Sequence, residues 1–140
     1  MPYSVVKDKK GFSLLEMMIV VALIAILSAM AVISINSNMP QYYLSGAARQ
    51  VLTDLMMARS KAVSNNTATT VTFSSTGYSI GGVTTNISSQ FKGVSLSSTG
   101  SITFFTMGTT SGSVTITLTG SSGLAPKQVV VSAAGRIRIK

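Results

Sequence analysis

The sequence has no cysteine and no histidine, and only three of its 140 residues are acidic. Without these residue types the chain has no disulfide, no Cys/His metal site, no cysteine nucleophile and no Ser-His-Asp triad. Glu16 and Asp54, the two acids beyond residue 11, lie 38 positions apart in the sequence. They offer no pair of carboxylates for acid/base catalysis. These absences argue against an enzyme before any fold is considered.

Charged residues make up 10 % of the chain, well below the roughly 25 % typical of globular proteins. Eleven lysines and arginines against three acids give a formal charge of +8. The positive balance therefore comes from scarce acids rather than from dense basic runs. It permits anionic partners without requiring them. The length fits one domain plus an anchor.

An uncharged apolar run follows the first basic residues. The stretch Lys9-Lys10-Gly11-Phe12-Ser13-Leu14-Leu15-Glu16 leads into Met17–Ile35, in which Ser28 and Ser34 are the only hydroxyl residues. As a helix, this run is about long enough to cross a bilayer core of roughly 30 Å. The sequence predicts a transmembrane helix over residues 12–39, with Lys7, Lys9 and Lys10 on the cytoplasmic side.

This stretch resembles the class III signal of type IV pilins and type II secretion pseudopilins. The resemblance implies that a prepilin peptidase cuts between Gly11 and Phe12 and methylates the new N-terminus of Phe12. Glu16 falls at the acidic position of the family, where it would pair with the Phe12 amine of a neighbouring subunit. An alternative is that Glu16 reaches the lipid headgroups. The alternatives for the whole segment are a cleaved secretory signal, for which Ala29-Met30-Ala31 is the nearest match, and an ordinary anchor.

The next segment is amphipathic. Pro40 predicts a kink or the start of a new helix, and Asn65-Asn66 predicts its end. Between them, apolar residues recur at steps of three and four and predict a helix that covers a sheet. Leu52 and Met56 are expected to widen this stripe, which consists of Leu44, Ala48, Val51, Leu55, Ala58 and Ala62.

From Thr67 onward, short β-branched runs alternate with glycines and predict a small antiparallel sandwich. We expect hairpins at Ser111-Gly112 and Ala134-Gly135. The fold class is therefore α+β, a long N-terminal helix packed on an antiparallel β domain. The predicted strands are Thr67–Phe73, Tyr78–Ile80, Val83–Ile87, Phe91–Leu96, Ile102–Thr106, Val114–Leu118, Gln128–Val131 and Arg136–Ile139.

Two further patterns resemble the H-type pseudopilins and the related minor pilins (GspH, FimT and FimU-like). The first is the helical segment Ala47–Ala62, with Asp54-Leu55 and Ala58-Arg59-Ser60 in it, and the second is the ending Val129–Ile139. Residues 74–101 carry neither of these two patterns. Many members carry a proline near the position of Ile33, whereas this chain has Pro40 instead.

The C-terminus carries three alternating cations, Arg136, Arg138 and Lys140, which in a strand would lie on one side. One interpretation is that they guard an exposed edge against aggregation. The other is weak, salt-sensitive DNA binding, because some FimT-like minor pilins with a Gly-Arg-x-Arg terminus act as DNA receptors. The sequence offers no adjacent aromatic residue for base stacking.

We therefore expect a leader (residues 1–11), a transmembrane and filament-core helix (12–39), an amphipathic helix (40–66) and a β domain (67–140). The resemblance implies a minor subunit of a type II secretion pseudopilus or a type IV pilus, which primes or caps its assembly. It also implies a single pass through the bacterial inner membrane, with the C-terminal domain in the periplasm before assembly. The implied partners are prepilin peptidase, other pilins, membrane lipid and the assembly platform. The rival hypotheses are a DNA-binding competence pilin and a membrane-anchored enzyme.

Overall fold

The computed structural model describes residues 11–98, 100–121 and 123–140, without the side chains of residues 30–37. The chain divides into two compact units at the Ser37–Asn38 boundary. Helix α1 (Leu14–Ser64) is assigned without a break through Pro40. Pro40 therefore does not begin a second helix, which corrects one of the two outcomes expected for it.

Helix α1 ends where the sequence predicts, at the asparagine pair. The amide of Thr67 donates to the carbonyl of Ala62 at 3.2 Å, and the amide of Asn66 donates to that of Val63 at 3.4 Å. Asn66 has a φ of 48°, a left-handed conformation that asparagine tolerates better than most residues. Together these features form a Schellman motif, which satisfies the last carbonyls of the helix.

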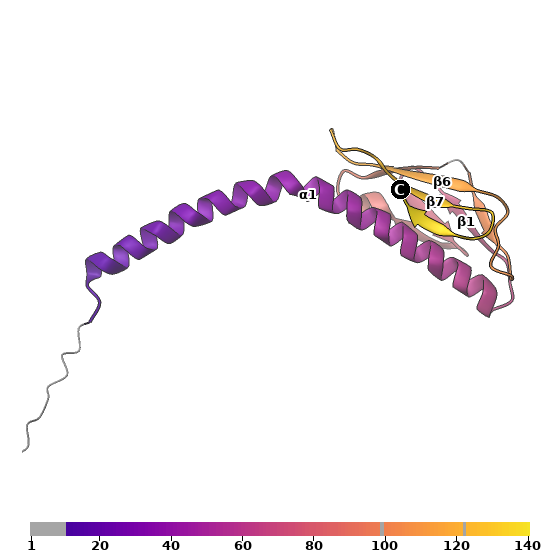
Figure 1. The fold of residues 1–140 in the computed structure, drawn as a ribbon, viewed down its shortest axis with the longest axis horizontal. Coiled ribbons are helices and arrows are strands. Elements are labelled where there is room, and N and C mark those ends of the chain that lie inside the picture. Colours follow the sequence, from indigo (N-terminus) through magenta and orange to yellow (C-terminus); the bar gives the residue numbers. More distant parts are fainter. Residues whose placement is uncertain (1–10, 99, 122) are drawn as a thin grey trace, which may run out of the picture. The chain divides into compact units, whose positions relative to one another are not determined.

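The second unit contains two antiparallel four-stranded sheets packed with the C-terminal part of α1, which confirms the predicted α+β class. In Figure 1, β1, β6 and β7 lie beside this part of the helix. The first sheet has the order β3-β2-β1-β5 and the second has the order β4-β6-β7-β8. The bounds are β1 (Thr69–Phe73), β2 (Gly77–Ile80), β3 (Val83–Asn86), β4 (Ser95–Ser98), β5 (Ile102–Phe104), β6 (Val114–Thr119), β7 (Lys127–Val131) and β8 (Ile137–Ile139).

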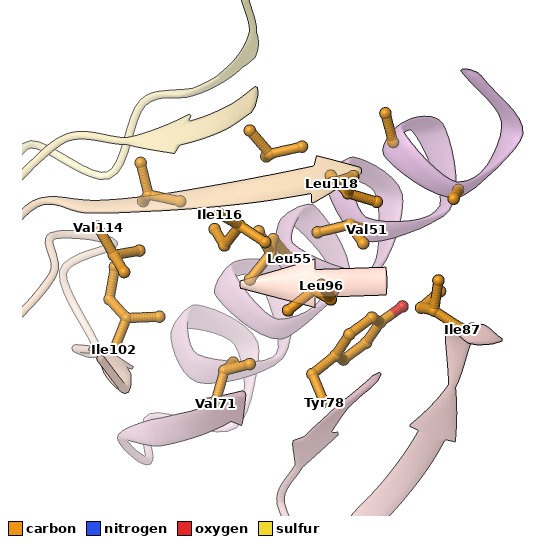
Figure 2. Packing of buried hydrophobic residues seen from close by; sticks show 14 of the residues in the cluster. Val51, Leu55, Val71, Tyr78, Ile87, Leu96, Ile102, Val114, Ile116 and Leu118 are labelled. Atoms are coloured by element: carbon orange, nitrogen blue, oxygen red, sulfur yellow. The ribbon is translucent and has the colours of Figure 1, made fainter. Parts of the chain in front are cut away.

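The core lies between the sheets and one face of α1. All six residues of the predicted helical stripe are at most 2 % exposed, and Ala47 joins them. Strand β6 alternates buried and half-buried residues until Thr119, so Val114, Ile116 and Leu118 face inward. Figure 2 shows these side chains converging with Val51 and Leu55 of α1 and with Tyr78 and Leu96 of the strands. The helix thus completes a core that the sheets alone would leave open.

Two sequence predictions in the middle of the chain are wrong. The strand expected over Val83–Ile87 stops at Asn86, whose side chain accepts the Ser89 amide at 3.1 Å and caps the one-turn helix α2 (Ile87–Gln90). The strand expected over Phe91–Leu96 is a turn as far as Gly93, and β4 begins only at Ser95. Gly93 has a φ of 79°, which a regular strand cannot accommodate.

Of the two predicted hairpins, the one at Ala134-Gly135 is confirmed. It joins β7 to β8, and Gly135 has a φ of 76° at the turn. The hairpin at Ser111-Gly112 is wrong, because β5 and β6 belong to different sheets. The chain instead turns back at residues 105–109, where the Phe105 amide donates to the Thr109 carbonyl at 2.8 Å. It then crosses to the second sheet.

Candidate functional site

The predicted cleavage site lies just before α1. Gly11 and Phe12 precede the helix and are exposed, and the Phe12 side chain is 81 % exposed. Among the described residues, no atom lies within 4 Å of the position that a Cβ at Gly11 would occupy. The peptide bond between them is therefore in open, non-helical chain, as a protease requires. Lys7, Lys9 and Lys10 lie outside the described residues.

Glu16 lies in the first turn of α1 and is exposed. A carboxylate there interacts favourably with the N-terminal end of the helix dipole. Ser13 and Glu16 also have the spacing of a capping box, and the Ser13 carbonyl accepts the Met17 amide at 3.2 Å. Glu16 therefore has a local role available in addition to the intersubunit pair implied by the resemblance, and an experiment must separate the two.

The N-terminal part of α1 carries uncovered apolar side chains on all sides. The large apolar residues from Leu14 to Leu27 are 44–77 % exposed. Within the described residues, no helix has an apolar stretch long enough to span a membrane. The predicted transmembrane segment, 12–39, includes residues 30–37, whose side chains lie outside the described part of the chain.

The C-terminal cations form one row along β8. The ladder with β7 extends past the strand, because Lys140 and Gln128 exchange backbone hydrogen bonds of 2.7 and 3.2 Å. Arg138 pairs with Val130 in the same ladder, and the Ser132 amide donates to the Arg136 carbonyl at 2.9 Å. Alternation along the ladder places Arg136, Arg138 and Lys140 on one face, and all three are exposed.

The rest of this outer face is rich in hydroxyl groups. Thr115, Thr117 and Thr119 alternate with the buried residues of β6. Ser95 and Ser97 continue the face on β4, and the Ser95 and Thr119 hydroxyls lie 2.7 Å apart. Strands β4, β6, β7 and β8 contain no aromatic residue. The face can therefore contact phosphate groups but has no stacking platform for bases.

Asp54 has a structural role that the sequence alone did not reveal. Its carboxylate accepts hydrogen bonds from the Tyr78 hydroxyl and, at 3.1 and 3.2 Å, from Gln50 Nε2. Tyr78 is 1 % exposed. Burial, followed by the hydrogen bond to Asp54 and its negative charge, raises the pKa of the Tyr78 hydroxyl far above its ordinary value. The network ties β2 to α1. In the sequence, Asp54 stands out only because it falls in the family pattern, and that pattern does not show that Tyr78 is its partner.

Arg59 was also missed as a contact residue. Its Nε donates to the Gly108 carbonyl at 2.9 Å. A Cβ at Gly135 would lie 2.0 Å from that same carbonyl oxygen and 3.2 Å from Arg59 Nε. Thr110 adds a tie to the same hairpin, since its one hydroxyl proton is shared between the Gly112 and Ser132 carbonyls, at 2.8 and 2.9 Å. Arg59 therefore holds the turn at residues 105–109 against α1, and the Gly135 turn packs closely against both.

Two family models match the chain, one in its N-terminal segment and one in the rest. The model of the family described as Type II transport protein GspH matches residues 47–135, well over half of the chain. The chain belongs to the GspH family. The model described as Prokaryotic N-terminal methylation motif matches residues 6–32. No curated protein matches the chain. The GspH family consists of pilin-like structural subunits rather than enzymes.

Solved structures similar to this GspH-family chain include two crystal forms of the type IV minor pilin FimU from Pseudomonas aeruginosa. The first has a TM-score of 0.60 at 21 % identity and covers 71 % of this chain and 90 % of FimU. The second has a TM-score of 0.57 at 21 % identity, with coverages of 69 % and 92 %. At this identity the likeness shows a shared fold.

Among the described residues, no cluster of acidic side chains could hold a metal ion.

Proposed function

We propose that the chain is a minor subunit of a type II secretion pseudopilus or a type IV pilus. The observation that carries the proposal is the pairing of two unlike parts in one GspH-family chain. A methylation-motif helix with 44–77 % exposed apolar side chains precedes a folded β domain that buries its own apolar residues. Such a helix needs an apolar environment outside its own domain, which a membrane provides first and a filament core provides afterwards.

In this proposal, prepilin peptidase cuts between Gly11 and Phe12 and methylates the Phe12 amine. The lysines of the leader stay in the cytoplasm, and the helix anchors the chain in the inner membrane with residues 67–140 in the periplasm. The open chain around Gly11 supports processing at this bond. The assembly platform then moves the subunit into the filament, where it primes or caps assembly.

Within the filament, Glu16 pairs with the Phe12 amine of a neighbouring subunit. An unpaired carboxylate in an apolar helix bundle costs a few kcal/mol, so the pair fixes the axial position of each helix. Exposure of both residues supports this, because each side chain is open to a neighbouring subunit.

The test is Glu16→Gln, which separates the charge pair from the capping role. Glutamine at this position still serves a capping box, so helix α1 and processing remain intact. The amount of subunit in sheared filaments should fall about tenfold, as loss of roughly 1.4 kcal/mol of pairing predicts. Glu16→Ala should behave in the same way. Normal entry of Glu16→Gln into filaments would contradict the charge pair.

A second candidate function is DNA binding through Arg136, Arg138 and Lys140. It is favoured by the placement of these three exposed cations in one row beside a face of threonine and serine hydroxyls. Three phosphate contacts give weak binding with a strong dependence on salt and no base preference. The competing structural role is protection of the open edge of β8.

A further inference from the structure

The second unit presents many cations and one acidic side chain, which is half-exposed. Its sequence contains one acid, Asp54, whose carboxylate is hydrogen-bonded to Gln50 and Tyr78. A copy of this unit therefore offers another copy eight cations against one half-exposed carboxylate, which already accepts hydrogen bonds within its own fold. This imbalance favours a different, more acidic protein as the partner in contacts of opposite charge. The cations of this unit are Arg49, Arg59, Lys61, Lys92, Lys127, Arg136, Arg138 and Lys140.

One of these cations lies in a hollow whose walls are partly apolar. The hollow has a volume of about 550 Å³ and lies between α1 and the turn at residues 105–109. On α1 its lining residues follow the spacing of a single helix face, namely i, i+3, i+4, i+7 and i+8. These are Met56, Arg59, Ser60, Val63 and Ser64, and the turn contributes Met107 and Gly108.

The apolar side chains that line this hollow are largely exposed to solvent. Met107 is 87 % exposed, and Met56 and Val63 are each 49 % exposed. Met56 was expected to join the buried stripe of α1, and the structure corrects this. The turn that presents Met107 is fixed by two backbone hydrogen bonds of 2.8 and 2.9 Å at Phe105 and Gly108. Exposed methionines gathered at one place are typical of protein-binding surfaces.

Arg59 supplies the charge in this hollow. Its Nε is already committed to the Gly108 carbonyl, which fixes the position of the guanidinium. Asp54, the single acidic side chain of this unit, accepts from Gln50 and Tyr78 rather than from Arg59. A fixed guanidinium with free N–H groups binds a carboxylate in a defined geometry.

We propose that this hollow docks a different subunit of the filament, through a segment that carries a carboxylate beside an apolar side chain. The carboxylate pairs with Arg59, and the apolar side chain packs against Met56, Val63 and Met107. A second copy of this chain does not fit, because its Asp54 is occupied and its Glu16 is assigned to the Phe12 amine. This inference rests on the proposed function, since it names the kind of partner that the subunit meets there.

The experiment places a photoreactive benzoylphenylalanine at position 107 of the full chain, in cells that assemble the filament. A second substitution, Met56→Glu, adds a negative charge beside Arg59. The matched control is Met57→Glu, which adds the same charge at the adjacent position, where a side chain that is 62 % exposed faces a different hollow. Successive helical residues point about 100° apart, so the control stays off the proposed surface.

The expected result is a crosslink to another protein with a methylated N-terminus, at a peptide with Asp or Glu next to an apolar residue. Met56→Glu should lower the crosslink yield about tenfold, and Met57→Glu should leave it within about twofold, because only the former repels the partner carboxylate. A crosslink to a second copy, or equal yields for the two variants, would overturn the inference. N-terminal methylation is measured in the same sample. Its absence counts against the proposed function instead.

Discussion

The two halves of helix α1 are both rich in apolar residues, but the structure treats them in opposite ways. From Leu44 to Ala62 a single stripe is buried against the sheets, each member at most 2 % exposed. From Leu14 to Leu27 the large apolar residues are uncovered on every side, at 44–77 % exposure. The apolar residues from Leu44 to Ala62 recur with a period that matches one helix face, whereas the segment from Leu14 to Leu27 has no polar face at all.

This difference separates the roles of the two halves. The C-terminal or second half, Leu44–Ala62, is stabilised by its own domain, and its buried apolar stripe needs no other partner. The first half has no partner among the described residues, and under the proposed function lipid and then other helices cover its apolar surface. Mutations should therefore affect domain stability in the second half and assembly in the first.

The largest expected effect contrasts the two halves directly. Leu55→Ala should lower the free energy of unfolding by about 3–5 kcal/mol, because it leaves a cavity in a fully buried site. Leu23→Ala, at a side chain that is 55 % exposed, should change domain stability by less than about 0.5 kcal/mol. Both are measured by denaturant unfolding of the full chain in detergent. Equal losses would break the contrast between the halves.

A second comparison tests how closely the turn at Gly135 packs against the Gly108 carbonyl that Arg59 binds. Gly135→Ala should cost about 2–3 kcal/mol, because its Cβ would meet the Gly108 carbonyl and φ is positive. Gly123→Ala is the control. It has a φ of 94° but no described atom within 4 Å of the added Cβ, so only the backbone term of about 1 kcal/mol remains. Similar costs in thermal unfolding would mean that the close contact at Gly135 has no energetic weight.

A third effect concerns the polar tie between α1 and β2. Tyr78→Phe should lower the free energy of unfolding by about 1–2 kcal/mol, because it leaves Asp54 without its buried donor.

The raised pKa of Tyr78 also predicts that the protein loses stability at alkaline pH. The unfolded state loses this proton near pH 10 while the folded state keeps it, so stability falls by about 1.4 kcal/mol per pH unit above that pH. Tyr78→Phe should lack this slope. An unchanged slope in the variant would assign it to other groups.

The smallest expected effect concerns the basic row. Arg138→Gln should leave stability within about 0.5 kcal/mol of the parent. If the row binds DNA, the salt slope of duplex retention should fall by about 0.9, the contribution of one phosphate contact. Lys92→Gln, at an exposed cation outside the row, is the control. No measurable retention of DNA by the parent chain would leave edge protection as the role of these residues.

The sequence predicted those features that follow from local chemistry. The buried stripe of α1 was readable from its spacing, the helix end from Asn65-Asn66, and the last hairpin from Ala134-Gly135. The family followed from motif residues around Gly11 and from the patterns near Asp54 and Gly135, whereas the cut at Gly11 stays a prediction.

The rest depended on contacts between distant segments. No local signal shows that Asp54 binds Tyr78, that Arg59 binds the Gly108 carbonyl, or that β5 and β6 belong to different sheets. Met56 has the spacing of a core residue, but it lines the hollow beside the turn at residues 105–109 and is 49 % exposed. Asn86 ends β3 early because its side chain caps α2, an effect that β propensity does not capture.

The most direct test of pilin-type processing is the intact mass of the chain extracted from the membranes of cells with an active prepilin peptidase. We predict a mass that begins at Phe12 and carries one added methyl group. A full-length mass, or a cut near Ala31, would contradict processing at Gly11 and with it the assignment of the N-terminal helix to a filament core.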